Sequence, residues 1–459
     1  MQNSGEESAG GEGPAAGISL LLLGWSPEQA PIGLAGLGAL VTCVASSAEA
    51  PAARASGVLA RLVVVPDPAD VEGVVSGLAR AGLAPGDFSL VCSAHEFTLV
   101  AASVVAVLGG AASLPVPVAV ALRDKYVQKA RLRDAGVTVA DFATADTPLA
   151  VTDVADRLGG YPVVVKPIAG AGALHTARLD SAAEAEKWAD GAEVLPWLVE
   201  RYVSGAEVHI DGFVRAGEVG FLSVARYLTN LIELHDGEAL VGSVAVRPGE
   251  EPGLYARAGD LVRTSLRALG HADGVFHLEA FEQEDGSLVF GECGGRVGGG
   301  RVDHMVERTF GVDLHQQWVT SVLQVPADTV PQTSETGSYG WVHLSAPPGR
   351  VLFVPGREEV LGREGVVEVE LRAKAGDVVS ARRPDSRTRA ARALVTGRDV
   401  GEVRDRIAAL EKWFRGRVEV ERDGDGDSVE GVASVVSSGA SVSTVSSVST
   451  VSSAGSVGS

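Results

Sequence analysis

The first part of the chain alternates between short apolar runs and longer segments rich in alanine and leucine. Four runs, ISLLLL, ALVTCVA, ARLVVV and FSLVCS, have the length and composition of buried strands, and VEGVVSGLARAG between the last two has a helical pattern. Strands that alternate with helices indicate a parallel βαβ sheet. We therefore expect such a sheet, with covering helices, over residues 16–118.

Residues 97–122 contain no charged side chain, and a stretch of this length could span a bilayer. However, it contains Gly109-Gly110, Pro115 and Pro117, and its apolar residues are mostly alanine and valine. A helix that ends near Gly109, followed by a loop and a short strand, explains the pattern better. We therefore expect a buried core segment and no membrane span.

The pattern changes at residue 123, where RDKYVQKARLRDAG predicts a strongly charged helix that ends at Gly136. Strands are expected in YPVVVKP, TARLD, WLVERYV, EVHIDGFV, EVGFLSVARYL, GVFHLEAF and SLVFGE, with helices at SAAEAEKWAD and around 254–269. After residue 330, VLFVPG, VVEVELRA and ARALVTG predict a separate small α/β unit that is closed by the helix VRDRIAALEKWF.

The two ends of the chain differ from the rest in composition. The N-terminus, MQNSGEESAGGEG, is acidic and glycine-rich, and it lacks the basic segment of a secretory signal. Beyond about residue 422 the chain becomes a Ser/Val/Gly tract without an amphipathic period. We expect this tail to be disordered, with β structure in an assembly as the less favoured alternative.

Length and charge narrow the classes of protein. A chain of 459 residues suggests roughly two to four domains. With 39 Lys+Arg against 59 Asp+Glu, the net charge is −20, which argues against binding to nucleic acid or to an anionic membrane. The three cysteines (Cys43, Cys92, Cys293) form neither a metal-ligand pattern nor a disulfide framework, and this fits a reducing cytoplasm.

A hairpin is predicted in HLEAFEQEDGSLVFGE, residues 277–292, because Asp285-Gly286 is a preferred dipeptide of two-residue type I′ turns. The cross-strand pairs are then Glu284 with Ser287, Phe281 with Phe290, and Glu279 with Glu292. Residues paired in this way have Cβ atoms about 4.5–5.5 Å apart. The two glutamates would therefore face each other.

Two facing carboxylates repel unless a cation lies between them, and carboxylates on rigid strands suit a hard ion such as Mg²⁺ or Mn²⁺. The alternative is a solvated hairpin face. Arg296 lies four residues past Glu292 among glycines and could hold an anion beside the metal, and Gly298-Gly299-Gly300 before a helix offers backbone N–H groups to another. Phe281 shares the face of Glu279 and could lie under a planar base.

Candidate phosphate-binding residues occur upstream. Lys166 ends a predicted strand and is followed by IAGAGA, a loop that could close over phosphates or form an ordinary hairpin turn. Lys125 begins the charged helix, and its alternative interpretation is a solvated helix face. Glu200 and Glu207 flank a short extended linker.

The order of these motifs resembles that of the ATP-grasp superfamily of carboxylate–amine ligases over about residues 16–420. A lysine after an R-D-K helix start matches Lys125, and a lysine in a V-x-K-P strand matches Lys166. The H-x-E strand ends at Glu279, and the E-x-x-x-R motif runs from Glu292 to Arg296. The resemblance implies that Glu279 and Glu292 hold the metal and that Arg296 holds the phosphoryl or acyl-phosphate oxygens. The expected ATP site comprises the two lysines, the loop glycines, an adenine hinge, a ribose-binding acid and Phe281: Lys125, Lys166, Gly170, Gly172, Glu200, Arg201, Tyr202, Val203, Glu207 and Phe281.

One position departs from the family pattern. Many members have an Asn two residues after the second glutamate as a further metal ligand, whereas this chain has Gly294, which leaves open whether one or two metals bind. The small residues before Arg296, together with GRVLFVPG in the C-terminal part, are similar to the L-amino-acid (dipeptide) ligase branch.

The resemblance implies an α/β (α+β ATP-grasp) fold with a Rossmann-like pre-ATP-grasp domain, a two-lobed ATP-grasp domain and a small C-terminal α/β domain. The expected boundaries are 1–15 for a disordered N-terminus, 16–118 for the pre-ATP-grasp domain, 119–203 and 204–329 for the small and large lobes, 330–421 for the C-terminal domain and 422–459 for the tail.

The implied activity is ATP-dependent ligation of a small-molecule carboxylate to an amine through an acyl phosphate, with ATP and Mg²⁺ (or Mn²⁺) and with residues 169–173 as a lid. Carboxylation or ligation of the purine-synthesis type is an alternative, although no Met-Lys-Met biotinyl segment is present, and a non-catalytic ATP-binding protein is another. No nucleic-acid or membrane partner is expected, and a homodimer is left open. Four residues could line the substrate pockets or be structural: His95, Glu96, Arg247 and His304.

Overall fold

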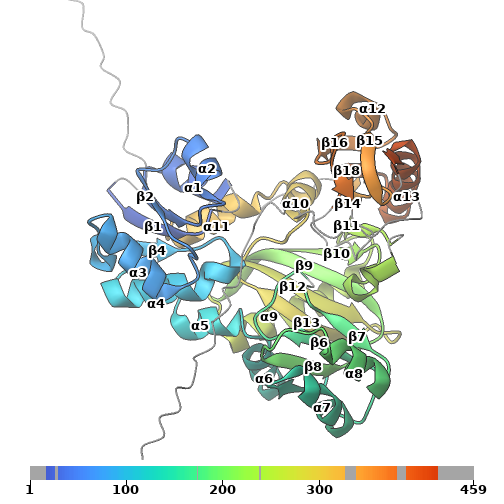
Figure 1. Ribbon diagram of the computed structural model, residues 1–459, viewed down its shortest axis with the longest axis horizontal. Coiled ribbons are helices and arrows are strands. Elements are labelled where there is room, and N and C mark those ends of the chain that lie inside the picture. The colour runs from blue at the N-terminus through green and yellow to red at the C-terminus, as the bar shows by residue number, and fades with distance from the viewer. Residues whose placement is uncertain are drawn as a thin grey trace, which may run out of the picture.

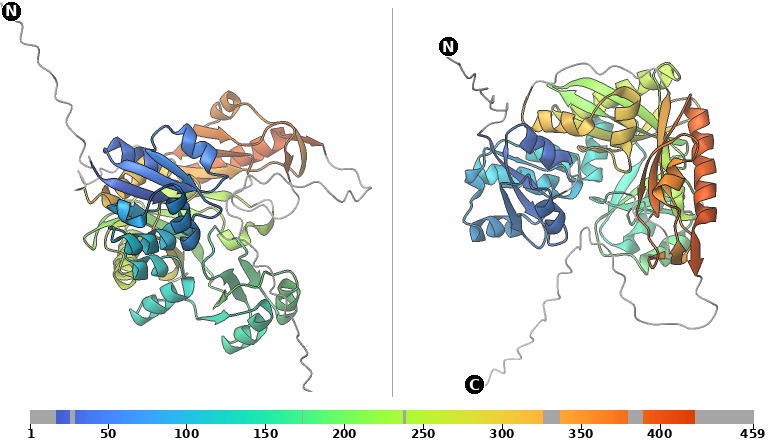
Figure 2. Two further views of the ribbon diagram at one scale, coloured as in Figure 1. Left: turned by 60° about the vertical axis from the view of Figure 1, so that its left-hand side comes forward. Right: turned by 90° about the horizontal axis from the view of Figure 1, so that it is seen from above.

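The computed structural model describes residues 17–25, 29–172, 174–236, 239–325, 337–379 and 389–421. The predicted N-terminal segment 1–15 and the predicted tail 422–459 lie outside these residues. Figure 1 shows an N-terminal domain in blue, a large central sheet, a smaller lobe below this sheet and a C-terminal unit in orange. Figure 2 shows that the N-terminal domain and the C-terminal unit lie on opposite sides of the molecule.

The N-terminal domain contains the predicted parallel sheet, in the order β3-β2-β1-β4. The strands are β1 (Ser19–Leu23), β2 (Leu40–Ala45), β3 (Arg61–Val64) and β4 (Leu90–Cys92), and the helices are α1 (Gln29–Gly36), α2 (Ala50–Ala55), α3 (Val71–Arg80) and α4 (Leu99–Gly109). The continuous apolar run of β1 is buried at four of its five residues, as expected of a parallel strand with helices on both faces.

The uncharged stretch 97–122 is a pair of helices. The predicted helix is α4, which ends with Gly110 in the left-handed conformation. The short strand predicted after it is wrong, because α5 (Val116–Ala121) occupies this position. Pro117 lies in the first turn of α5, where a missing N–H costs no helical hydrogen bond. Among the described helices, none has both the length and the apolar character needed to cross a membrane.

The small lobe is an antiparallel sheet in the order β5-β8-β6-β7 with three helices. Its elements are α6 (Lys125–Asp134), β5 (Phe142–Ala145), α7 (Val151–Arg157), β6 (Val163–Pro167), β7 (Ala177–Leu179), α8 (Ala182–Ala189) and β8 (Trp197–Arg201). Helix α6 buries Lys125, Gln128, Lys129 and Leu132, which lie on one helical face. The solvated-face interpretation of this charged helix is therefore wrong.

An eight-stranded sheet forms the centre of the molecule, in the order β13-β12-β9-β10-β11-β14-β18-β16. Its strands are β9 (Ala206–Arg215), β10 (Glu218–Tyr227), β11 (Val241–Val246), β12 (Gly274–Glu282), β13 (Leu288–Gly294), β14 (Ser338–Leu344), β16 (Val366–Leu371) and β18 (Ala391–Gly397). The sequence analysis did not identify β11 and β14. These two strands link β16 and β18 to β10, so the C-terminal unit shares this sheet and is not a separate layer.

Helices cover this sheet and connect it to the other parts. They are α9 (Pro252–Leu269), close to its predicted position, α10 (Val302–Phe310), α11 (Leu314–Val322), α12 (Arg357–Leu361) and α13 (Val400–Arg417). A second small sheet contains β17 (Val378–Val379), β15 (Gly349–Phe353) and β19 (Glu419–Glu421). Leu34 of α1 and Val319 of α11 belong to one hydrophobic core, which fixes the N-terminal domain against the central sheet.

Candidate active site

Glu279 on β12 and Glu292 on β13 are directly paired across the hairpin, as predicted. The predicted turn is nevertheless wrong. Gln283 N–H donates to Ser287 O, and the loop between these two residues has three residues, with Gly286 at φ +81°. Phe281 therefore pairs with Val289 instead of Phe290. An irregularity at Gly291 then restores the register. The glutamates therefore face each other because two one-residue shifts cancel.

Glu279 is held by neighbouring side chains. Its Oε1 accepts a hydrogen bond from the Tyr227 hydroxyl at 2.9 Å and lies 3.4 Å from His277 Nε2. Burial opposes ionisation of Glu279, but its contacts with His277 outweigh burial and lower its pKa to about 2. The carboxylate is therefore ionised throughout the physiological range.

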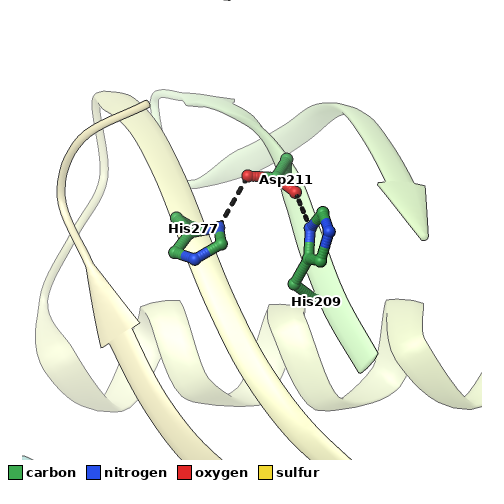
Figure 3. Close-up of side chains that lie close together, drawn as sticks. All are labelled: His209, Asp211 and His277. Atoms are coloured by element: carbon green, nitrogen blue, oxygen red, sulfur yellow. Dashed lines mark hydrogen bonds and ion pairs between the residues drawn. The ribbon is translucent and has the colours of Figure 1, made fainter. Parts of the chain in front are cut away.

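Figure 3 shows a buried histidine–aspartate–histidine network, which adjoins Glu279 through His277. His277 Nδ1 donates to Asp211 Oδ1 at 2.8 Å, and His209 Nδ1 donates to Asp211 Oδ2 at 2.5 Å. His209 Nε2 continues the network to the Ser243 hydroxyl at 2.7 Å. Burial lowers the pKa of His277, but the Asp211 carboxylate outweighs burial and raises it to about 10. His277 is therefore a cation that supports Glu279.

The same three side chains have the composition of a metal site, and their ligand atoms lie within 4.8 Å of one another. However, the ligands of a single ion with bonds near 2.0–2.2 Å lie about 3 Å or more apart. The nitrogen–oxygen separations of 2.5 and 2.8 Å are those of hydrogen bonds. This cluster is therefore a hydrogen-bonded network that supports Glu279, and not a metal site.

A Cβ atom at Gly298 would lie 2.7 Å from Asp211 Oδ1 and 2.9 Å from His277 Nδ1. Only glycine lets the backbone pass this close to the network. Close packing against the buried charges of Asp211 and His277 therefore explains why position 298 is a glycine.

The two predicted phosphate-binding lysines both lie against carboxylates. Lys125 Nζ is 2.7 Å from Glu292 Oε1 and donates to Gly170 O at 2.9 Å. Lys166 Nζ is 2.5 Å from Glu200 Oε1. The structure thus brings Lys125 to the glutamate pair and links Lys166 to the first residue of the predicted hinge.

Arg296 contacts the N-terminal domain. Its Nε donates to Glu96 Oε2, and Arg123 Nη1 lies 2.6 Å from Glu96 Oε1. Burial raises the pKa of Glu96, but the two guanidiniums, Arg296 first, outweigh burial and lower it to about 2. Arg123 also donates to the carbonyls of Ala169 and Gly170, so it fixes the start of the glycine loop. Gly172 in this loop has φ +63°, and Ala173 lies outside the described residues.

The predicted hinge connects β8 to β9. The Arg201 guanidinium donates to Gly159 O and Gly160 O, both at 3.1 Å, and the Arg178 guanidinium lies 4.1 Å from the centre of the Tyr202 ring. These side chains thus support the small lobe, while Val203 is half-buried.

Glu207 and Phe281 are direct cross-strand neighbours on β9 and β12, which places them on one face of the sheet. Glu207 Oε2 accepts a hydrogen bond from Leu231 N–H at 2.6 Å. Burial, followed by the charge of Glu279, raises the pKa of Glu207 to about 8. The expected ribose acid and the expected base-stacking ring are therefore adjacent.

Of the four residues predicted to line a substrate pocket or to be structural, His95 and Glu96 line a small cavity together with Arg296. Arg247 pairs with Glu250, and His304 pairs with Glu368. The sequence analysis missed several supporting residues: Arg123, Gln128, Lys129, Asp211 and Tyr227. Two patterns in the sequence pointed to such residues. Lys129 follows Lys125 by one helical turn, and His209 and Asp211 lie two residues apart on a strand, so the members of each pair share a face.

The chain is similar in sequence to known proteins. A family model described as L-amino acid ligase C-terminal domain 2 matches residues 342–419. Over 332 residues, the chain is 27% identical to an L-arginine-specific L-amino acid ligase of Bacillus subtilis. The aligned residues make up 70% of this chain and 78% of that protein.

Solved structures show the same fold. An L-amino acid ligase from Bacillus licheniformis has a TM-score of 0.69 at 20% identity, covering 88% of this chain and 99% of that one. A carboxyaminoimidazole ribonucleotide synthase of Aspergillus clavatus, solved with ATP, has a TM-score of 0.66 at 15% identity, covering 87% and 99%.

The fold is that of ATP-grasp ligases, and the sequence is similar to that of an L-amino acid ligase. Within this class the chain resembles the L-amino-acid ligases, as the sequence analysis predicted.

Proposed function

We propose that the protein joins two amino acids through an acyl phosphate and releases ADP and phosphate. The observation that carries the proposal is the pairing of Glu279 with Glu292, with Lys125 in contact with the second glutamate. The similarity to an L-amino acid ligase over most of the chain supports amino acids as the substrate class.

Each predicted site residue has a proposed role. Carboxylate oxygens are the donors that Mg²⁺ prefers, so the facing side chains of Glu279 and Glu292 fit the ion. When bound, the ion would neutralise phosphate charge. We assign phosphates to Lys125, Lys166, Gly170 and Gly172, adenine to Glu200, Arg201, Tyr202 and Val203, ribose to Glu207, and the face of the base to Phe281.

In the first step, a carboxylate oxygen of one amino acid attacks the γ-phosphorus of ATP, and the bond to the bridging oxygen of ADP breaks. In the second step, the amine of the other amino acid attacks the acyl carbon, loses a proton and expels phosphate. The Arg296 guanidinium, fixed by Glu96, would hold the oxygens on which charge develops. Positioning and charge neutralisation account for most of the acceleration in such transfers.

The decisive experiment measures phosphate release from ATP with pairs of amino acids. We expect release that requires both amino acids and a dipeptide product. Release with bicarbonate alone would favour the carboxylation alternative. ATP binding without turnover, in a screen of all amino-acid pairs, would favour a non-catalytic protein.

Glu292→Gln tests the metal assignment. It keeps the size of the side chain but removes the charge that an ion requires. We expect phosphate release to fall below detection while the far-ultraviolet circular dichroism stays that of the wild type. Full activity of this variant would remove Glu292 from the metal site.

We further propose a cytoplasmic location, which the three free, buried cysteines support. The homodimer stays a prediction, and the molar mass from light scattering would test it.

A further inference from the structure

We propose that Lys129 is a positioning residue that sets the charge of the phosphate site through Glu200 and Lys166. This inference rests on the proposed ATP site and assigns a residue that does not itself touch the nucleotide. Lys129 is only 2% exposed, and its Nζ lies 3.0 Å from Glu200 Oε2. The other oxygen of Glu200 lies 2.5 Å from Lys166 Nζ.

The three side chains form a buried row of two ammonium groups with one carboxylate between them. A pair of Lys166 and Glu200 alone would be neutral, and the carboxylate would cancel much of the attraction between Lys166 and a phosphate. Lys129 balances the charge of Glu200, so the row keeps a net charge of +1. Charges in a poorly hydrated site act strongly on one another, so the balance should affect nucleotide affinity.

Lys129 also fixes the geometry. Each oxygen of Glu200 has its own ammonium partner, so the carboxylate cannot rotate away from Lys166. Burial opposes ionisation of Glu200, but the two ammonium groups, Lys129 first, outweigh burial and lower its pKa to about 2. Lys129 comes from α6, one helical turn after Lys125, so a single helix supplies the ammonium group at Glu292 and the one behind Glu200.

The alternative is that Lys129 only fills the core, since its Nζ also lies 5.7 Å from the centre of the Phe290 ring. The two roles differ in which substitution preserves ATP affinity. If Lys129 acts through charge, Lys129→Arg should preserve more affinity than Lys129→Met, because it keeps a positive charge beside Glu200. If Lys129 acts only through packing, Lys129→Met, which has a side chain of similar length without the charge, should be the milder change.

The test is calorimetric titration of the full chain with ATP and Mg²⁺. We expect Lys129→Met to weaken ATP binding by at least about tenfold, the scale of one uncompensated charge in a poorly hydrated site. Lys129→Arg, which keeps the positive charge beside Glu200, should bind ATP more tightly than Lys129→Met. Lys187→Met removes a charge from the exposed surface of the same lobe and serves as the control.

Unaltered ATP affinity in folded Lys129→Met would overturn the proposal, and so would Lys129→Arg binding ATP as weakly as Lys129→Met. If Lys129→Met does not fold, Lys129→Arg decides, because it keeps the charge and changes the packing: near wild-type affinity supports the charge role, and a tenfold loss overturns it. If the wild type does not bind ATP, it is the proposed function that fails.

Discussion

Glu96 connects two arginines from different parts of the chain. Arg123 precedes α6 and Arg296 follows β13, and both contact the carboxylate that β4 and its loop supply from the N-terminal domain. A guanidinium held on one side by a carboxylate can present its remaining N–H groups in a fixed direction. Glu96 thus orients Arg296, whose catalytic role is the one proposed above.

Arg296→Ala should therefore affect chemistry more than nucleotide binding. Charge at the transferring group develops mainly in the transition state, so we expect kcat to fall by about 10²–10³, the scale of losing one preorganised donor. Arg296→Lys should recover only part, because it lacks the planar fork. Steady-state kinetics and ATP titration would check this. Weakened ATP binding with an unchanged kcat would instead make Arg296 a nucleotide anchor.

The ion pairs of Glu96 also predict a pH dependence of stability. Its pKa in the folded protein is about 2, below the value near 4.5 of a free glutamate. The stabilisation is therefore fully present above about pH 4.5 and declines as the pH falls towards 2. We expect the difference in unfolding free energy between the wild type and Glu96→Gln to shrink over this range. Denaturant titrations between pH 7 and pH 3 would measure it, and a difference independent of pH would contradict the assignment.

At the scale of elements, α6 holds the end of β13 through a side-chain amide. Gln128 Oε1 accepts from Cys293 N–H at 2.9 Å, and Gln128 Nε2 donates to Cys293 O at 2.7 Å. The amide thus takes the place of a neighbouring strand beside Glu292, on the edge strand of the sheet. This pair of hydrogen bonds fixes the position of the helix relative to the hairpin.

Gln128→Met should both destabilise the protein and disturb the metal site. A buried backbone group that loses its partner costs about 1–3 kcal/mol, and three such groups are affected: Cys293 N–H, Cys293 O and Ala121 O. We expect a loss of several kcal/mol in unfolding free energy and a lower kcat, measured by denaturant titration and phosphate release. Gln316→Met on the exposed side of α11 is the control. Wild-type stability and turnover in Gln128→Met would show that β13 is held by other contacts.

At the scale of the molecule, the N-terminal domain, the small lobe, the central sheet and the C-terminal unit all contribute to the site. The C-terminal unit contributes through Arg392 on β18, whose Nη1 donates to Gly300 O at 3.0 Å and whose Nη2 lies 3.2 Å from Glu370. Gly300 closes the glycine loop that follows Arg296. The C-terminal unit is therefore connected to the site in two ways, through the continuous sheet from β13 to β16 and through the hydrogen bond from Arg392 to Gly300.

Arg392→Met should reduce kcat by about tenfold, as expected when one hydrogen bond to a site loop is lost and the loop is less ordered. ATP affinity should change little, since no contact of Arg392 reaches the residues assigned to the nucleotide in the described part of the chain. Arg398→Met on the same unit, with its side chain 85% exposed, is the matched control. Equal kinetics of the two variants would remove Arg392 from the support of the loop.

Local patterns in the sequence were sufficient to predict most of the elements and the fold class. The apolar runs predicted the parallel N-terminal sheet, and alternation along the strands placed Glu279 and Phe281 on one face. Such features follow from the period of a strand and from the burial of apolar residues, which act over a few neighbouring residues. Motif order predicted the ATP-grasp class for the same reason, because each motif is a short run of particular side chains.

Only the tertiary structure decided the partners of the buried charges. The spacing of Lys129, Glu200 and Lys166 along the chain gives no sign that they meet, and Glu96 lies 200 residues from Arg296. The turn and the irregularity at Gly291 also depended on tertiary context, since the preferred turn of Asp285-Gly286 gave way to a three-residue loop. Burial makes an unpaired charge costly, so packing selects each partner, and long-range packing is not encoded in any local pattern.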